Sequence, residues 1–334
     1  MPLRPRASVA LLLAGSLLLG LAHIALLPPW EGFDETGHYS YIQQVATTGH
    51  WTRRGDMMSK DIDDYLKVAP ANENVPRQST YHGFFGGGAQ VVARGRDMVH
   101  APPPLPRRFA PGTIGNWQAQ HPPLYYYLMA PAYLASNGWS LGAQLFLLRT
   151  ISYLIAWCSL ALLAFLALRY FADDERLGVL LPLAIGLGPL IFPMWFPEMA
   201  RIGNDSLIVL FAACTLLLVE RAARNGAIVP QALLGATLGL ALLTKATYLP
   251  VAAAVLTVLA GLTWRDWRAP DQRVQRLKAV AVCVLVAGCI SAWWYVGTSI
   301  ETGSLIGSND VVNLKPAGGM LEDLRNVLAR YRLA

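Results

Sequence analysis

The chain begins with an apolar run long enough to cross a membrane. Ala7–Leu27 holds 21 residues without a Lys, Arg, Asp or Glu, and about 20 such residues suffice to span the hydrocarbon core. With that run, six later apolar segments predict an all-α polytopic membrane protein of about seven transmembrane helices. The six further crossings are expected at 141–168, 177–196, 204–222, 229–245, 247–263 and 279–298.

The composition agrees with a membrane protein. Of the 334 residues, 54% are hydrophobic and 14% are charged, whereas a soluble domain carries roughly 25% charged residues. The net charge is +6, but the basic residues are dispersed over loops and indicate no nucleic-acid module. All four cysteines lie in apolar runs, so neither a disulfide framework nor a metal-type spacing is expected. The first run exceeds the roughly 7–15 residues of a signal-peptide core, so we interpret it as a retained anchor.

The basic residues also predict the topology. Eleven Lys and Arg flank the spans on one face, against two in the short loops opposite, and such residues favour the cytoplasmic side. The long segment after the first span is then external. The predicted organisation is a cytoplasmic N terminus with the first span (1–27), an external loop with interfacial helices (28–140), a six-helix transmembrane bundle (141–298) and an external tail with an amphipathic helix (299–334).

The external loop is predicted to be mostly irregular up to its end. Gly- and Pro-rich pieces such as Gly86-Gly87-Gly88 mark turns rather than regular elements. Residues 122–135 form a helix too short to span the membrane. Its four tyrosines favour the headgroup level, so we interpret this helix as interfacial.

An acidic pair follows the first span. Asp34 and Glu35 open a predicted helix, and His38 shares a face with Asp34. A carboxylate here could act as a general base, or the three side chains could bind a divalent cation, although metal sites usually have more protein ligands. Acids are also favoured at helix N-termini for electrostatic reasons alone. His121 is expected at the same membrane surface, where it either converges with Asp34 or caps the short helix.

A second group of charges lies near the outer ends of later spans. Only 14 uncharged residues separate Asp205 from Glu220, too few to cross the bilayer at about 1.5 Å per residue. We therefore expect Asp205 below the interface, either at a functional site or in an ion pair with Arg201 or Arg149. Lys245 is the only charge between residues 226 and 264. It either reaches the surface along its apolar stem or binds an anion such as a lipid phosphate.

Together and in order, these pieces resemble the GT-C superfamily of polytopic glycosyltransferases, nearest to the ArnT and protein O-mannosyltransferase-like enzymes and the related DUF2142 membrane proteins. The resemblance implies a GT-C-type helix bundle whose long first external loop carries interfacial helices and a catalytic Asp. Two features depart from it: the chain ends after about seven spans, which suggests truncation, and 50–116 matches nothing in the family. The resemblance covers Leu11–Leu305. Its motifs are Phe33-Asp34-Glu35-Thr36-Gly37-His38-Tyr39, with Gly49 closing the helix that follows, His121-Pro122-Pro123-Leu124-Tyr125-Tyr126, Gly203-Asn204-Asp205-Ser206-Leu207, Leu242-Leu243-Thr244-Lys245, and Trp293-Trp294-Tyr295 followed by Gly303-Ser304.

The resemblance implies a glycosyltransferase of the plasma (inner) membrane. It would transfer a sugar from a polyprenyl-phosphate donor to an acceptor hydroxyl at the external face, with Asp34 as base and Glu35 orienting the acceptor or a cation. Lys245 and Arg201 would offset charge on the departing phosphate. The expected partners are the lipid-linked donor, a lipid, glycan or protein acceptor, and the bilayer, and a divalent cation is the only cofactor considered. The other substrate-binding candidates are His38, His121, Asn204 and Asp205.

Two other classes of function stay open. A transporter or lipid flippase would account for Asp205 and Lys245 as intramembrane charges. It predicts internal repeats, which the sequence lacks, and it leaves the long external loop unexplained. A non-catalytic assembly partner would tolerate the loss of Asp34.

Overall fold

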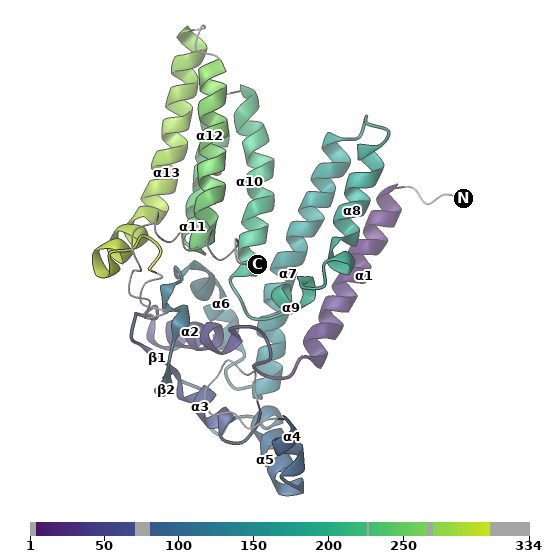
Figure 1. Ribbon diagram of the computed structural model, residues 1–334, viewed down its shortest axis with the longest axis vertical. Coiled ribbons are helices and arrows are strands. Elements are labelled where there is room, and N and C mark those ends of the chain that lie inside the picture. The colour runs from purple at the N-terminus through teal and green to yellow at the C-terminus, as the bar shows by residue number, and fades with distance from the viewer. Residues whose placement is uncertain (1–4, 71–80, 226, 266–269, 308–334) are drawn as a thin grey trace, which may run out of the picture. The chain divides into compact units, whose positions relative to one another are not determined.

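The computed structural model describes residues 5–70, 81–225, 227–265 and 270–307, and these are almost entirely helical (Figure 1). The chain divides into two compact units, Met1–Ser291 and Ala292–Ala334. The expected amphipathic helix of the tail lies outside the described residues. The elements are α1 (Pro5–Leu26), α2 (Glu35–Thr48), β1 (Met57–Ser59), α3 (Lys60–Leu66), α4 (Tyr81–Gly86), α5 (Ala89–His100), β2 (Pro111–Gly115), the 3₁₀ turn η1 (Trp117–Gln120), α6 (Leu124–Ala135), α7 (Leu141–Tyr170), α8 (Leu177–Ile191), α9 (Trp195–Met199), α10 (Asp205–Asn225), α11 (Ile228–Leu242), η2 (Ala246–Tyr248), α12 (Leu249–Arg265) and α13 (Pro270–Thr302).

Among the described residues, five helices are long and apolar enough to cross a membrane. The expected spans 177–196 and 229–245 correspond to α8 and α11, which have 15 residues each. At about 1.5 Å per residue such helices are roughly 22 Å long, short of the ~30 Å hydrocarbon core. The structure therefore supports a multi-pass membrane protein, and the count of seven spans stays a prediction. The five candidate spans are Arg6–Leu26, Leu141–Tyr170, Asp205–Arg224, Ala246–Arg265 and Asp271–Thr302.

The long helices of the first unit pack through close approaches at small residues. Figure 1 shows α1, α7 and α8 side by side, and α7 also packs against α10. A Cβ added at Gly20 of α1 would lie 2.0 Å from Cζ of Tyr153 on α7, so only glycine leaves room for this ring. The Tyr153 hydroxyl donates to the carbonyl of Ser16 at 2.6 Å. On α11, a Cβ at Gly235 would lie 2.4 Å from the carbonyl oxygen of Cys283 on α13.

The segment expected to be an irregular external loop is folded and shares an apolar core with α7 and the start of α10. β1 and β2 form an antiparallel pair in which Met57 lies opposite Gly115, and α2, α3 and α6 contribute buried side chains to one apolar cluster. The triple glycine lies where α4 meets α5, with Gly88 at a φ of 87°. As the sequence suggested, Gly49 closes α2: it adopts a φ of 75° and its N–H donates to the carbonyl of Val45. The end of α2 is thus set by a nearby glycine, whereas the pairing of β1 with β2 joins residues far apart in the sequence.

The short helix α6 lies in the protein interior rather than exposing its tyrosines. Tyr125, Tyr126 and Tyr133 are fully buried, and only Tyr127 is exposed. The hydroxyls of the first two find protein partners, because Tyr125 bonds to Ser152 at 2.5 Å and Tyr126 to His38 at 3.0 Å. Three of the four tyrosines thus face the protein, and the interfacial depth of α6 stays a prediction. The three buried tyrosines pack α6 against α2 and α7.

Candidate active site

The chain turns sharply between α1 and α2, in a segment we call the corner (residues 27–35). Two of its residues that are not glycine adopt left-handed conformations, Trp30 with a φ of 66° and Asp34 with a φ of 58°. Such conformations cost on the order of 1–3 kcal/mol each and persist only where the surroundings impose them. The Trp30 indole is buried edge-on against the rings of Tyr39 and Tyr65, at 5.0 and 5.9 Å between centroids. Packing therefore holds the corner in a strained shape directly before Asp34.

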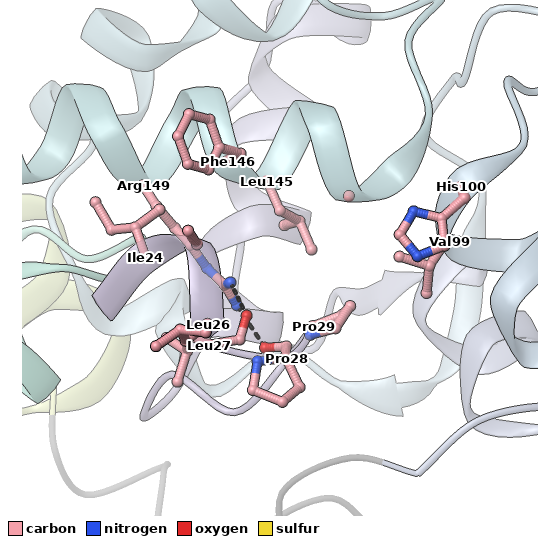
Figure 2. A pocket seen from close by; sticks show the side chains of 12 residues that line it. Ile24, Leu26, Leu27, Pro28, Pro29, Val99, His100, Leu145, Phe146 and Arg149 are labelled. Atoms are coloured by element: carbon pink, nitrogen blue, oxygen red, sulfur yellow. Dashed lines mark hydrogen bonds between the residues drawn. The ribbon is translucent and has the colours of Figure 1, made fainter. Parts of the chain in front are cut away.

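A buried ion pair completes the corner. Arg149 of α7 donates from Nε and Nη2 to the two carboxylate oxygens of Glu35, at 2.7 and 2.5 Å. Its guanidinium also donates to the carbonyls of Leu27 and Pro28, as Figure 2 shows. Burial alone would raise the pKa of Glu35, but the charge and hydrogen bonds of Arg149 hold this pKa below its usual value. Glu35 is thus an ionised carboxylate in the interior, which also accepts the N–H of Ile202.

Asp34 points to a different neighbour. It precedes α2 without capping the helix, and its Oδ1 accepts the indole N–H of Trp117 at 2.9 Å. The side chain is half-buried, so part of the carboxylate is open to an incoming group. The preceding residue, Phe33, is 53% exposed, and its ring centroid lies 5.9 Å from Cζ of Arg201. Asp34 thus directly follows a residue whose ring packs against the guanidinium of Arg201.

The guanidinium of Arg201 belongs to a cluster of two cations and two carboxylates, Glu198, Arg201, Asp205 and Lys245, which we call the charge cluster. Arg201 donates to Glu198 at 2.6 Å and to Asp205 at 3.2 Å, and Lys245 donates to the other oxygen of Asp205 at 2.7 Å. The expected ion pair of Asp205 is thus made with Arg201 and not with Arg149. Arg201 is 3% exposed, yet its Nε and Nη1 have no hydrogen-bond partner among the described residues.

Two imidazoles lie beside the charge cluster. The rings of His38 and His121 are 6.1 Å apart and nearly parallel, at 7°. Burial lowers the pKa of His38 well below its usual value, and nearby positive charge, Arg201 first, acts in the same direction. Burial and the charge of Lys245 lower the pKa of His121 to about 3. Both rings are therefore neutral at pH 7 and offer hydrogen bonds without adding charge.

Backbone contacts bring these segments together from distant parts of the sequence. The N–H of Leu124, at the start of α6, donates to the carbonyl of Leu243 at 3.1 Å, which places the residues after His121 beside the end of α11. Asn204 donates from its side chain to the carbonyl of Thr244 at 3.2 Å. Its Oδ1 is buried and has no partner among the described residues. Asn204 thus holds the backbone of Thr244, the residue before Lys245, in place.

The structure therefore divides the candidates into two groups. His38, His121, Arg201, Asn204, Asp205 and Lys245 converge, and Asp34 borders them through Phe33. Both oxygens of Glu35 bond to Arg149, and one also accepts the N–H of Ile202, the residue after Arg201. Nowhere in residues 5–70, 81–225, 227–265 and 270–307 do three His, Cys, Asp or Glu side chains gather as metal ligands. Oδ1 of Asp34 bonds to Trp117, and Nδ1 of His38 lies 3.0 Å from the hydroxyl of Tyr126.

Sequence reasoning missed the partners that hold the site. Trp117, Tyr126 and Glu198 carry no local signal of their roles. Arg149 entered only as an alternative partner of Asp205. A signal for Arg149 was present, because it is the only charged residue in the expected span 141–168, and charges within spans are usually paired or functional.

No protein-family model, curated protein or solved structure matches the chain.

Proposed function

We propose that this protein is an integral membrane glycosyltransferase that transfers a sugar from a polyprenyl-phosphate donor to an acceptor hydroxyl. The observation that carries the proposal is Arg201, a buried guanidinium that has two nitrogens without a hydrogen-bond partner among the described residues. Asp205 joins it to Lys245, and its Cζ lies 5.9 Å from the ring centroid of Phe33, the residue before Asp34. A buried N–H without a partner costs about 1–3 kcal/mol, so an anionic ligand would relieve a real penalty. Two cations near a carboxylate suit a phosphate leaving group next to a base.

The leaving phosphate would bind at the charge cluster. Nε and Nη1 of Arg201 have no hydrogen-bond partner among the described residues, and each can donate to one phosphate oxygen. Lys245 is 18% exposed and bonds to Asp205, so its ammonium can contact a second oxygen while keeping this partner. Asp205 separates the two cations and reduces their mutual repulsion before the donor arrives. Preorganised positive charge at the point where negative charge develops lowers the barrier.

Asp34 would act as the general base. The acceptor oxygen forms a bond to the anomeric carbon, its proton passes to the Asp34 carboxylate, and the bond between the anomeric carbon and the phosphate oxygen breaks. The electron pair of that bond leaves with the polyprenyl phosphate. Trp117 fixes the carboxylate through Oδ1, which leaves Oδ2 for the acceptor. A positioned base of this kind contributes about 10²–10⁴-fold to the rate.

The remaining candidate residues would bind the substrates or position the residues that bind them. His38 and His121 are neutral beside the charge cluster, His38 buried and His121 partly buried. Both suit hydrogen bonds to sugar hydroxyls or phosphate oxygens. Asn204 positions Lys245 through Thr244. We assign Glu35 a positioning role in place of acceptor contact, because Arg149 and Ile202 occupy its oxygens. The external active site and the plasma-membrane location belong to the proposal and depend on the basic-residue asymmetry.

Two variants separate the proposed roles. Asp34→Asn keeps size and hydrogen bonding but removes the basic carboxylate, so transfer should fall at least about 10²-fold while donor binding holds. Lys245→Met keeps the apolar stem and removes the cation, so it should weaken binding of a polyprenyl phosphate. Lys60→Met is a matched control, because Lys60 is an exposed cation whose partner Asp64 lies on the same helix α3.

The measurement is native mass spectrometry in nanodiscs with added polyprenyl phosphate, combined with a transfer assay using lipid-linked sugars. Lipid retained by the wild type and by Lys60→Met, but lost from Lys245→Met, supports the charge cluster as the phosphate site. Transfer that survives Asp34→Asn at near-full rate contradicts the base assignment. Movement of the lipid between leaflets without transfer would favour the flippase instead.

A further inference from the structure

A cavity of about 270 Å³ is lined in part by Arg149 and by the corner. The end of α1 and the corner form one wall, the first turns of α7 a second, and the end of α5 a third (Figure 2). Most of the side chains that line it are apolar. They include Ile24, Leu27, Pro29, Val99, Leu145 and Phe146.

The polar groups at its edges carry little net charge. Arg149 lies at one side, but its guanidinium is neutralised by Glu35 and donates to the carbonyls of Leu27 and Pro28. His100 lies at the opposite side, at the end of α5, as Figure 2 shows. A free anion would find no unpaired cation in this cavity. The lining therefore suits an apolar occupant.

Close packing of two helices forms one side of the cavity. A Cβ added at Gly142 of α7 would lie 3.1 Å from Cγ1 of Val99 and 3.3 Å from its carbonyl oxygen. The absence of a side chain at Gly142 thus lets the end of α5 rest on α7. The cavity is a built feature of the fold rather than a gap left by loose loops.

The position of the cavity identifies its occupant. Its walls include the ends of Arg6–Leu26 and Leu141–Tyr170, both long and apolar enough to span a membrane. At its rim Leu26 is 81% exposed and Phe146 is 44% exposed. Large apolar side chains exposed together at the end of a span mark contact with hydrocarbon or with a partner. Both candidate spans end at the cavity, so in a bilayer hydrocarbon chains lie next to its apolar rim.

We propose that this cavity binds one acyl chain of a bilayer phospholipid, with the chain entering between α1 and α7. Its volume lies just below the roughly 300–1,000 Å³ of pockets that enclose a whole drug-sized ligand, which fits part of one chain. The neutralised Arg149 explains why a hydrocarbon and not a charged headgroup fills the inner end. Lipid binding in this cavity does not depend on sugar transfer, and the labelling experiment can support or contradict it whatever the transfer assay shows.

The test uses the full chain in nanodiscs that contain a phosphatidylcholine with a diazirine near the end of one acyl chain. After illumination, labelled peptides are mapped by mass spectrometry. Ala25→Trp places a large ring at a residue that lines the cavity, and Ala22→Trp makes the same change at an exposed residue of α1 outside the lining. Ala25→Phe supplies a smaller obstruction should the tryptophan impair folding, which gel filtration and thermal unfolding report.

In the wild type, labelling should concentrate on residues 24–29 and 142–149. Ala25→Trp should reduce it there at least about tenfold, equivalent to about 1.4 kcal/mol or the burial of roughly two methylene groups. Ala22→Trp should leave it unchanged. Labelling spread evenly over the exposed faces of the long helices would indicate ordinary surrounding lipid and overturn the proposal, as would equal labelling of both variants. Displacement of the probe by excess polyprenyl phosphate would overturn the assignment to a phospholipid chain.

Discussion

Replacement of Arg149 by methionine should destabilise the protein strongly. Arg149 is 3% exposed and donates hydrogen bonds to both oxygens of Glu35 and to two carbonyls of the corner. In Arg149→Met the carboxylate of Glu35 keeps the N–H of Ile202 but loses its counter-charge. Removing one partner of a buried ion pair typically costs about 3–5 kcal/mol, because the remaining charge stays buried without compensation.

The assay is the free energy of unfolding of the purified protein in mixed detergent micelles. Arg169→Met is the matched control, because Arg169 lies on the same helix and is exposed. It should change stability by less than about 0.5 kcal/mol. The double variant Arg149→Met/Glu35→Gln should recover at least about 1 kcal/mol relative to Arg149→Met, because the two charges interact directly. Equal losses in Arg149→Met and Arg169→Met would refute the reasoning.

The pH dependence supplies an independent check with a definite sign. In the wild type the pKa of Glu35 is held below its unfolded value of about 4.3. Its contribution is therefore full above about pH 4.3 and is lost as pH falls through the folded pKa. In Arg149→Met burial, the largest influence on Glu35, is opposed only by the N–H of Ile202 and the charge of Arg201, so the pKa of Glu35 should rise above the unfolded value. The folded variant then binds the proton more readily, and its stability should increase as pH falls toward about 4.3.

Two further predictions concern topology and packing. In a cysteine-free background, a membrane-impermeant thiol reagent should label Arg94→Cys but not Gln272→Cys from outside, and the reverse pattern would invert the proposed orientation. Gly20→Ala should destabilise the protein by about 1–3 kcal/mol, because the added methyl overlaps the ring of Tyr153. Gly15→Ala on the same helix meets no atom within 4 Å, so it should be neutral or stabilise by up to about 1 kcal/mol; similar values for the two would contradict the packing.

The sequence by itself determined the membrane class and the positions of the long helices. Apolar runs are local signals, so 7–27, 141–168 and 247–263 overlap helices long enough to span. The same holds for the start of α2 at Glu35 and its end at Gly49, where a glycine can adopt a positive φ. Hydrogen bonds within a few residues decide these features, and no distant contact is needed.

Tertiary structure decided which charges meet. Glu35 and Arg149 are 114 residues apart, and Lys245 and Asp205 are 40 apart, so no spacing rule could pair them. The sequence showed the charges in the apolar segments, and it left open whether Asp205 paired with Arg201 or Arg149. Burial then separated two adjacent carboxylates: Glu35 turned inward to its counter-charge, and Asp34 stayed half-exposed beside Trp117. Long-range packing sets the local dielectric and the available partners, and these decide which acid is structural and which is free to react.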